Sequence, residues 1–199
     1  MGRAINNYTM QNVNLYMVLL GCTPKGRHIE QHDVFFGIAN NIKELVPEMI
    51  AFWPEAEGDI HIDAWRIIKH IDGYNISVSG KPVELLPGNS TIDNKLFFLN
   101  LGGYKQNEFE EYHYKMLAVA GNKGLAVQQA KQTAFYKHTG FKGAESHIDD
   151  KYGVDIDNVH AVEDILPAAV KEKYTVVITE GNGHKNDELH LGYFMLDKL

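Results

Sequence analysis

Two short patterns in this sequence combine histidine with carboxylate residues, the side chains that most often bind metals or transfer protons. Glu30 and His32 are separated by one residue, and His61 and Asp63 have the same spacing. Residues i and i+2 of a strand lie on the same face of a sheet, so each pair would present both groups side by side. Two histidines and a carboxylate can hold a divalent metal, and a histidine oriented by a carboxylate can act as a general base.

Both patterns recur in the second half of the chain. Glu111 and His113 repeat the first pair, and we align His147 and Asp149 with the second pair. The segments 22–29 and 103–110 directly precede the first pair of each half and would form the rim of a pocket. The candidate ligand-binding residues are therefore Glu30, His32, His61, Asp63, Glu111, His113, His147 and Asp149.

The recurrence belongs to a longer internal repeat. Positions 15–41 align with positions 96–122 without a gap, and seven aligned positions are identical, where chance would give about two. With five residues inserted, the segment 61–63 then falls on the segment 147–149. We expect a first repeat over 14–79, a linker over 80–95, and a second repeat over 96–199 that ends in an additional helix and strand.

Apolar runs and turn residues predict the elements that carry these pairs. In each repeat two strands precede a helix, and Asn41 and Asn122 are suited to cap its N-terminus. Pro47 either begins the regular part of the first helix or kinks it, and Asp72-Gly73 is a strong hairpin signal. The predicted strands are 15–20, 31–39, 65–71, 74–78, 96–101, 112–120, 174–179 and 189–196, with helices after 41, at 123–138 and at 164–173, and a hairpin loop at 180–187.

Each repeat therefore has a ββαββ-like order. This order predicts an α+β fold with mainly antiparallel sheets covered by helices. Two copies of one unit usually pack about an axis, so we also expect a pseudo-two-fold arrangement.

The composition narrows the class of protein. The chain has 199 residues, a formal net charge of −7, ten histidines and one cysteine. The negative charge argues against nucleic acid and anionic membranes as partners, and a single cysteine fits a reducing cytoplasm. The longest apolar run near the start, 15–20, is too short to span a bilayer. We expect a cytoplasmic protein whose partner is a small molecule, another protein or a second copy of itself.

The sequence resembles a known family over nearly its whole length. The resemblance is carried by MVLLGCTPKGR at 17–27, EQHD at 30–33 and HIDAW at 61–65, with LGGY at 101–104 and FEEYH at 109–113. These runs resemble the bacterial domain-of-unknown-function family 1543. Its members carry one or two copies of the domain, so the resemblance implies two tandem copies here. The family has no established activity and supplies no catalytic residue.

Three functions fit these observations. The first is binding of a small ligand or protein partner through the duplicated Glu/His and His/Asp pockets. The second is a metal-assisted hydrolase or isomerase that uses the same residues and a divalent metal. The third is a purely structural subunit in which the same residues bond to one another. Cys22 is a poor candidate for a nucleophile, because its counterpart in the second repeat is Gly103.

Overall fold

The computed structural model describes residues 13–81, 94–104, 109–139, 155–181 and 185–199. The chain forms two units, which we describe separately. Unit 1 comprises residues 1–68 together with 188–199, and unit 2 comprises residues 69–187. The C-terminal segment therefore returns to the first unit, whereas the sequence assigned it to the second repeat. In the described parts of the chain, no helix is both long enough and apolar enough to cross a membrane.

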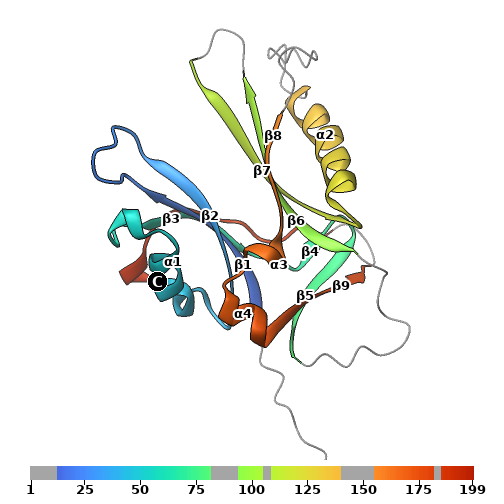
Figure 1. The fold of residues 1–199 in the computed structure, drawn as a ribbon, viewed down its shortest axis with the longest axis horizontal. Coiled ribbons are helices and arrows are strands. Elements are labelled where there is room, and N and C mark those ends of the chain that lie inside the picture. Colours follow the sequence, from blue (N-terminus) through green and yellow to red (C-terminus); the bar gives the residue numbers. More distant parts are fainter. Residues whose placement is uncertain (1–12, 82–93, 105–108, 140–154, 182–184) are drawn as a thin grey trace, which may run out of the picture. The chain divides into compact units, whose positions relative to one another are not determined.

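Unit 1 is built on a four-stranded antiparallel sheet with the order β10-β3-β1-β2 (Figure 1). A short helical segment follows β2, and a last 3-10 turn ends the chain. The strands are β1 (Asn14–Cys22), β2 (Gln31–Ala39), β3 (His61–Ile67) and β10 (His190–Met195), and the helical elements are η1 (Ile42–Leu45), α1 (Val46–Phe52), η2 (Pro54–Ala56) and η3 (Leu196–Lys198).

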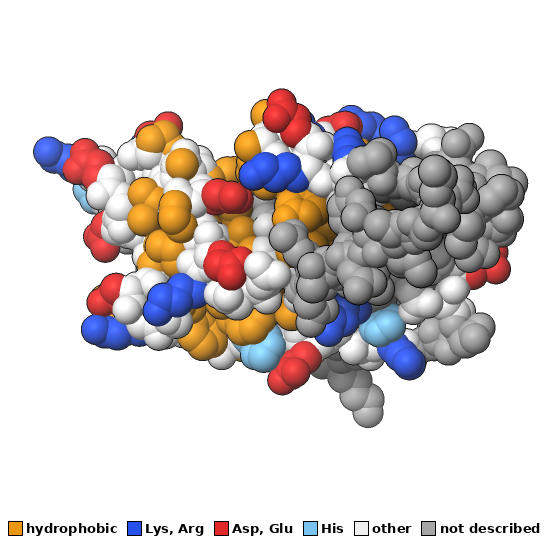
Figure 2. Space-filling model, turned by 90° about the horizontal axis from the view of Figure 1, so that it is seen from below, with side chains coloured by type: hydrophobic (Ala, Val, Ile, Leu, Met, Phe, Trp, Pro, Cys, Tyr) orange, Lys and Arg blue, Asp and Glu red, His pale blue; other side chains and the backbone are white. Residues whose placement is uncertain are grey.

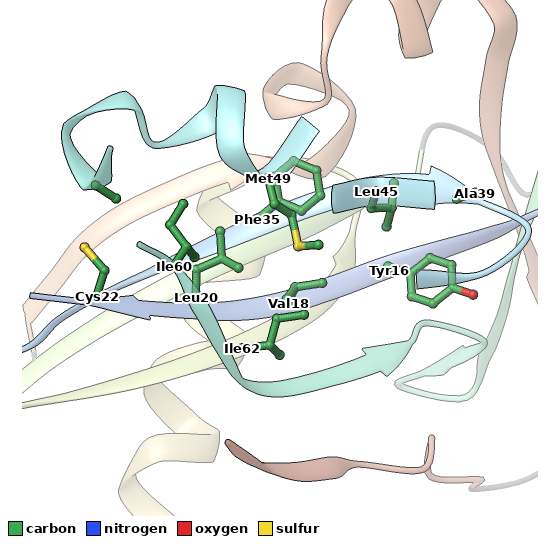
Figure 3. Close-up of a cluster of buried hydrophobic side chains, with 11 residues drawn as sticks. Tyr16, Val18, Leu20, Cys22, Phe35, Ala39, Leu45, Met49, Ile60 and Ile62 are labelled. Atoms are coloured by element: carbon green, nitrogen blue, oxygen red, sulfur yellow. The ribbon is translucent and has the colours of Figure 1, made fainter. Parts of the chain in front are cut away.

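The helical segment of unit 1 covers one face of this sheet. Asn41 accepts a hydrogen bond from the backbone N–H of Glu44 and so caps η1, and Pro47 lies in the first turn of α1, where its missing N–H costs nothing. Leu45 and Met49 are fully buried, and Figure 3 shows Met49 lying between α1 and the strands. The core residues of β1 alternate along the strand: Tyr16, Val18, Leu20 and Cys22.

Unit 2 contains two three-stranded antiparallel sheets, with the orders β7-β6-β8 and β4-β5-β9. The strands are β4 (His70–Ile71), β5 (Tyr74–Gly80), β6 (Lys95–Tyr104), β7 (Glu111–Ala120), β8 (Asp155–Ala161) and β9 (Tyr174–Glu180), and the helices are α2 (Lys123–Thr139), α3 (Val162–Ile165) and α4 (Ala168–Lys173). Asn122 caps α2 by accepting from the N–H of Leu125 at 3.0 Å. Ala126 and Ala130 of α2 are fully buried against β6 and β7.

The predicted fold class is confirmed in its coarse form, since the chain is α+β and its paired strands are antiparallel. The hairpin at Asp72-Gly73 is also confirmed: both residues have positive φ, and β4 pairs with β5 across them. The predicted strand 65–71 is divided, because its first part ends β3 at Ile67 and pairs with β1, whereas its last part is β4, which pairs with β5. The tandem ββαββ repeat and the pseudo-two-fold axis stay predictions.

One expectation about the C-terminal segment is wrong. The loop at 180–187 is not a hairpin loop, because β9 pairs with β5 in unit 2 and β10 pairs with β3 in unit 1. The reason is visible at Asp187, whose carboxylate accepts hydrogen bonds from the backbone N–H groups of Lys69 and His70, both at 3.0 Å. Asp187 is thus held to the start of β4. The predicted helix 164–173 is divided into α3 and α4 at Pro167.

Candidate functional site

The candidate site lies at one end of the unit 1 sheet, across three neighbouring strands. On the central strand β1, Gly21 stands opposite His32 of β2 and opposite His61 of β3. Residues directly opposite each other in an antiparallel sheet share a face, so the two histidines flank the glycine on the same face. The strand register thus brings together residues 29 positions apart.

A register shift places Asp63 in the same group. Leu20 pairs with Ile62, but the next residue of β1, Leu19, pairs with Ala64. Asp63 is therefore the extra residue of a β-bulge. Bulges redirect side chains, and they are frequent beside functional sites. Glu30 stands immediately before β2 and completes the group of four.

The four side chains form a closed ring of contacts. Each histidine Nε2 lies beside both carboxylates. His32 Nε2 is 3.4 Å from Glu30 Oε2 and 3.2 Å from Asp63 Oδ2. His61 Nε2 is 3.0 Å from Glu30 Oε1 and 3.2 Å from Asp63 Oδ1. All four predicted residues of the first repeat are therefore in one place.

Gly21 is required by the close approach of these groups. A Cβ atom at this position would lie 2.5 Å from His61 Nε2 and 2.6 Å from Asp63 Oδ2. Such distances are far below van der Waals contact. The absence of a side chain on β1 thus leaves the space into which the polar atoms converge.

Burial differs across the ring. The side chain of His61 is 9% exposed and that of Asp63 is 27% exposed, whereas His32 and Glu30 are 38% and 43% exposed. Among the described residues, neither His61 Nε2 nor Asp63 Oδ2 has a hydrogen-bond partner, although both atoms are buried. The contacts in the ring are close but are not well-directed hydrogen bonds. Buried polar atoms without partners are costly, so this inner half of the ring calls for an additional partner.

The ring of His61 is held from one side by an aromatic residue. Tyr193 of β10 stacks on it, with ring centroids 4.2 Å apart and an interplanar angle of 28°. The pairing of β10 with β3 shifts register between Leu191 and Phe194. Gly192 lies within this shift, and its backbone φ of 139° is one that glycine adopts more readily than other residues. This irregularity sets the position of Tyr193 on the edge strand. Sequence reasoning did not find Tyr193, because it assigned β10 to the other repeat.

The donor set suits a divalent cation. Two imidazole nitrogens and two carboxylates are ligands of zinc and related metals, which they bind at about 2.0–2.2 Å. Neighbouring ligand atoms around a tetrahedral cation with such bonds are about 3.3 Å apart, close to the 3.0–3.4 Å separations in the ring. As the side chains stand, no group of three or more His, Cys, Asp or Glu residues in the described part of the chain is arranged to hold a metal ion. Binding would therefore require Glu30 and His32, the exposed members, to adjust.

Cys22 is not part of this arrangement. It follows Gly21 on β1 and so lies on the opposite face, in the core under the helical segment (Figure 3). Burial raises the pKa of the Cys22 thiol above its usual value, and the negative charges of Asp59 and Glu30 raise it further. A protonated, buried thiol is a weak nucleophile.

The predicted pocket of the second repeat is described only in part. Glu111 and His113 begin β7, and His113 stands opposite Gly102 as His32 stands opposite Gly21. His147 and Asp149 lie outside the described residues. The strand that pairs with β6 on its other side is β8, and it places Asp155 opposite Gly102.

The protein is thus of the α+β class, with antiparallel sheets and a histidine-carboxylate ring at the end of one of them. Residues 27–78 match the sequence model of Domain of Unknown Function (DUF1543). This match supports the family resemblance for that segment, which contains all four residues of the ring. A second copy of the domain is not matched and stays a prediction.

Comparison with solved structures supports the fold. The chain is similar to the crystal structure of a protein Il1583 from Idiomarina loihiensis, with a TM-score of 0.61 and 20% sequence identity. The similarity covers 92% of this chain and 98% of the other chain. At this identity the likeness extends to the fold alone. No curated protein matches the chain, so the comparisons assign it no activity.

Proposed function

We propose that unit 1 binds a divalent metal ion through Glu30, His32, His61 and Asp63, and that the bound metal holds a small ligand. The observation that carries this proposal is the buried Nε2 atom of His61, which faces the ring and has no hydrogen-bond partner among the described residues. A metal ion would satisfy this nitrogen and the buried Asp63 Oδ2 at the same time. Two carboxylates and two neutral imidazoles would also balance the charge of one divalent cation.

The structural alternative is a network of ion pairs that closes the end of the sheet. Such a network would direct N–H groups at carboxylate oxygens, because a buried donor that misses its acceptor costs about 1–3 kcal/mol. The 3.0–3.4 Å contacts leave His61 Nε2 and Asp63 Oδ2 without hydrogen bonds. These observations favour a bound cation.

The exposed half of the ring supports binding of a ligand to the metal. Glu30 and His32 are each more than a third exposed, so a cation there could be reached from solvent. Metal sites with an open position polarise a bound oxygen or activate a water molecule. Metal-assisted hydrolysis is therefore the second candidate function, and a carboxylate released from the metal would serve as its general base.

We also propose that the chain contains two tandem copies of one domain related by a pseudo-two-fold axis. Matching strand orders, β2-β1-β3 and β7-β6-β8, support the duplication, as do register shifts at equivalent positions of β1 and β6.

A cytoplasmic protein whose partner is a small molecule or another protein agrees with the acidic composition. Figure 2 shows Lys and Arg side chains mixed with Asp and Glu side chains on the face in view, without a large patch of one sign.

Metal analysis tests the proposed site. The full chain, purified without a histidine tag, is dialysed against Zn²⁺, and its metal content is compared with that of His61→Ala. We expect the variant to lose one equivalent of zinc. The matched control is His190→Ala, which removes another histidine of the same sheet that stacks on an aromatic ring, Trp65, but lies outside the ring of contacts. Equal zinc contents in all three proteins would contradict the proposal.

A further inference from the structure

We propose that the ligand held at the unit 1 site is a small carboxylate that carries an aromatic group. Its carboxylate would bind the metal, and its aromatic group would lie on an apolar platform formed by Leu191, Tyr193 and Met195 of β10. This inference rests on the proposed function and names the class of ligand for it. Three features of β10 support it: its register with β3, the exposure of its side chains and the stacking of Tyr193 on His61.

Met195 and Tyr193 lie directly beside His61. Met195 is paired with His61 across β10 and β3, and residues opposite each other in a sheet share a face. The aromatic ring of Tyr193 stacks on the imidazole of His61, with centroids 4.2 Å apart. Both side chains are therefore on the face of the sheet that carries the ring of contacts.

Leu191 extends the platform along β10, the edge strand of this sheet. It pairs with Ala64 of β3, which pairs in turn with Leu19 of β1. Leu19 is two residues before Gly21, so both lie on the same face of β1. Leu191 is therefore on the same face as the ring of contacts.

The side chains of the platform are apolar and yet exposed. Leu191 is 71% exposed, Tyr193 is 69% exposed and Met195 is 49% exposed. On the other face of the same strand, Phe194 packs on the core of unit 1. The solvent face of an antiparallel strand normally carries polar residues. Neighbouring exposed apolar residues beside a polar site indicate instead a surface that binds a ligand.

The residue types of the platform favour an aromatic group over an alkyl chain. Tyr193 contacts His61 through its ring, and its large exposed fraction is surface on which a second aromatic ring can stack. The thioether of a methionine such as Met195 makes favourable contacts with aromatic rings. Leu191 adds apolar contact area beside them.

The ring of contacts determines the polar end of the ligand. Glu30 is its most exposed member and carries one negative charge. A carboxylate from solution can replace Glu30 on the metal without changing the charge balance, whereas a neutral ligand would leave a net positive charge. The exchange leaves three protein ligands, the number found in zinc sites whose fourth position is exchangeable.

Titration of the Co²⁺-loaded full chain with phenylacetate and with acetate tests this inference. The two probes share a carboxylate and differ by one phenyl group. We expect both to shift the visible absorption of bound Co²⁺, and phenylacetate to bind about tenfold more tightly, since burial and stacking of the phenyl group both add affinity. Cyclohexylacetate, which has a similar size without aromatic character, should bind less tightly than phenylacetate.

Substitutions on β10 locate the aromatic group. Leu191→Ser and Tyr193→Ala should each lower the ratio of phenylacetate affinity to acetate affinity by about threefold or more, because each removes apolar contact area. Tyr193→Phe keeps the aromatic ring and should keep the ratio. The matched control is Ile50→Ala, which removes an exposed apolar side chain from α1 and should leave the ratio unchanged.

The outcomes separate this inference from the proposed function. Equal affinities for phenylacetate and acetate in a chain that shows Co²⁺ bands would overturn the inference and leave the metal site intact. A chain without Co²⁺ bands would contradict the metal site and this inference together. Tighter binding of cyclohexylacetate than of phenylacetate would contradict an aromatic ligand. Should Tyr193→Ala lose the Co²⁺ bands, Leu191→Ser decides: an unchanged affinity ratio in that variant contradicts the platform.

Discussion

The sheet of unit 1 and the β7-β6-β8 sheet of unit 2 have the same central geometry and different side chains on it. Both have a glycine between two flanking polar residues and a bulge at the same position of the central strand. In unit 1 the residue opposite the glycine on the third strand is His61, and in unit 2 it is Asp155. The two sheets therefore share the backbone register around the glycine, whereas the residue type at the flanking position differs.

The helices that cover the two sheets differ in a second way. In unit 1 the large side chains of Leu45 and Met49 fill the space above the strands, whereas in unit 2 the helix α2 presents Ala126 and Ala130. Small residues allow a helix to lie close to a sheet, and large residues fill a wider gap. We therefore expect unit 1 to lose stability when a core side chain is made smaller. We expect unit 2 to lose stability when a core side chain of α2 is made larger.

The largest expected effects are on stability and follow from these cores. Met49→Ala removes a fully buried side chain and should cost about 2–5 kcal/mol. Ala130→Leu should cost about 1–3 kcal/mol, because it adds volume where α2 is packed closely. Urea unfolding of each variant measures both effects. A stabilising Ala130→Leu would mean that α2 does not lie as close to its sheet as described.

The next largest effect is expected on zinc affinity, when Gly21 is substituted. The substitution Gly21→Ala would place a methyl group among the atoms of the ring and should weaken zinc binding by about 100-fold, the upper end of what loss of a supporting interaction costs a metal site. Isothermal titration calorimetry measures the change. Gly80→Ala is the matched control, since a Cβ there meets no atom within 4 Å. Similar zinc affinities of the two variants would show that Gly21 does not keep the site open.

A smaller effect is expected at the two helix caps. Asn41 accepts from the N–H of Glu44 at 3.3 Å, and Asn122 accepts from the N–H of Leu125 at 3.0 Å. Each substitution to alanine should lower stability by about 1 kcal/mol, because it leaves a backbone donor without its acceptor. Thermal unfolding followed by circular dichroism compares them. A loss in one variant only would show that these equivalent positions do not have equivalent roles.

The smallest effect is expected for Cys22. Cys22→Ala should change zinc affinity by less than about twofold, because the thiol lies on the opposite face of the sheet from the ring. Its raised pKa also predicts slow alkylation of the native protein at neutral pH, since less of the thiol is ionised. Thiol labelling with and without denaturant checks this prediction. Rapid labelling of the folded chain would contradict the buried position.

The sequence predicted the features that depend on local patterns. An apolar run that ends at a glycine indicated β1, and Asn41 and Asn122 marked the helix starts that they cap. The i, i+2 spacing placed the members of each His/carboxylate pair on one face. The four residues of the first pocket meet as expected, because the sheet register joins the two pairs across Gly21.

The features that the sequence did not predict depend on pairing between distant segments. No local pattern shows that β10 joins β3, so Tyr193 could not be connected with His61. The bulge at Asp63 is likewise defined only by the partner strand. In the second half, His147 and Asp149 lie outside the described residues, so their predicted place beside Glu111 and His113 stays a prediction.

Glu30, His32, His61 and Asp63 together form the proposed cation site of unit 1. The most direct test is titration of the full chain with Co²⁺, whose visible absorption reports its ligands and coordination number. We predict saturable absorption bands that Zn²⁺ suppresses, that His61→Ala and Asp63→Asn abolish, and that His190→Ala preserves. Absence of such bands in the wild-type protein, or their persistence in His61→Ala, would contradict a cation site formed by these four residues.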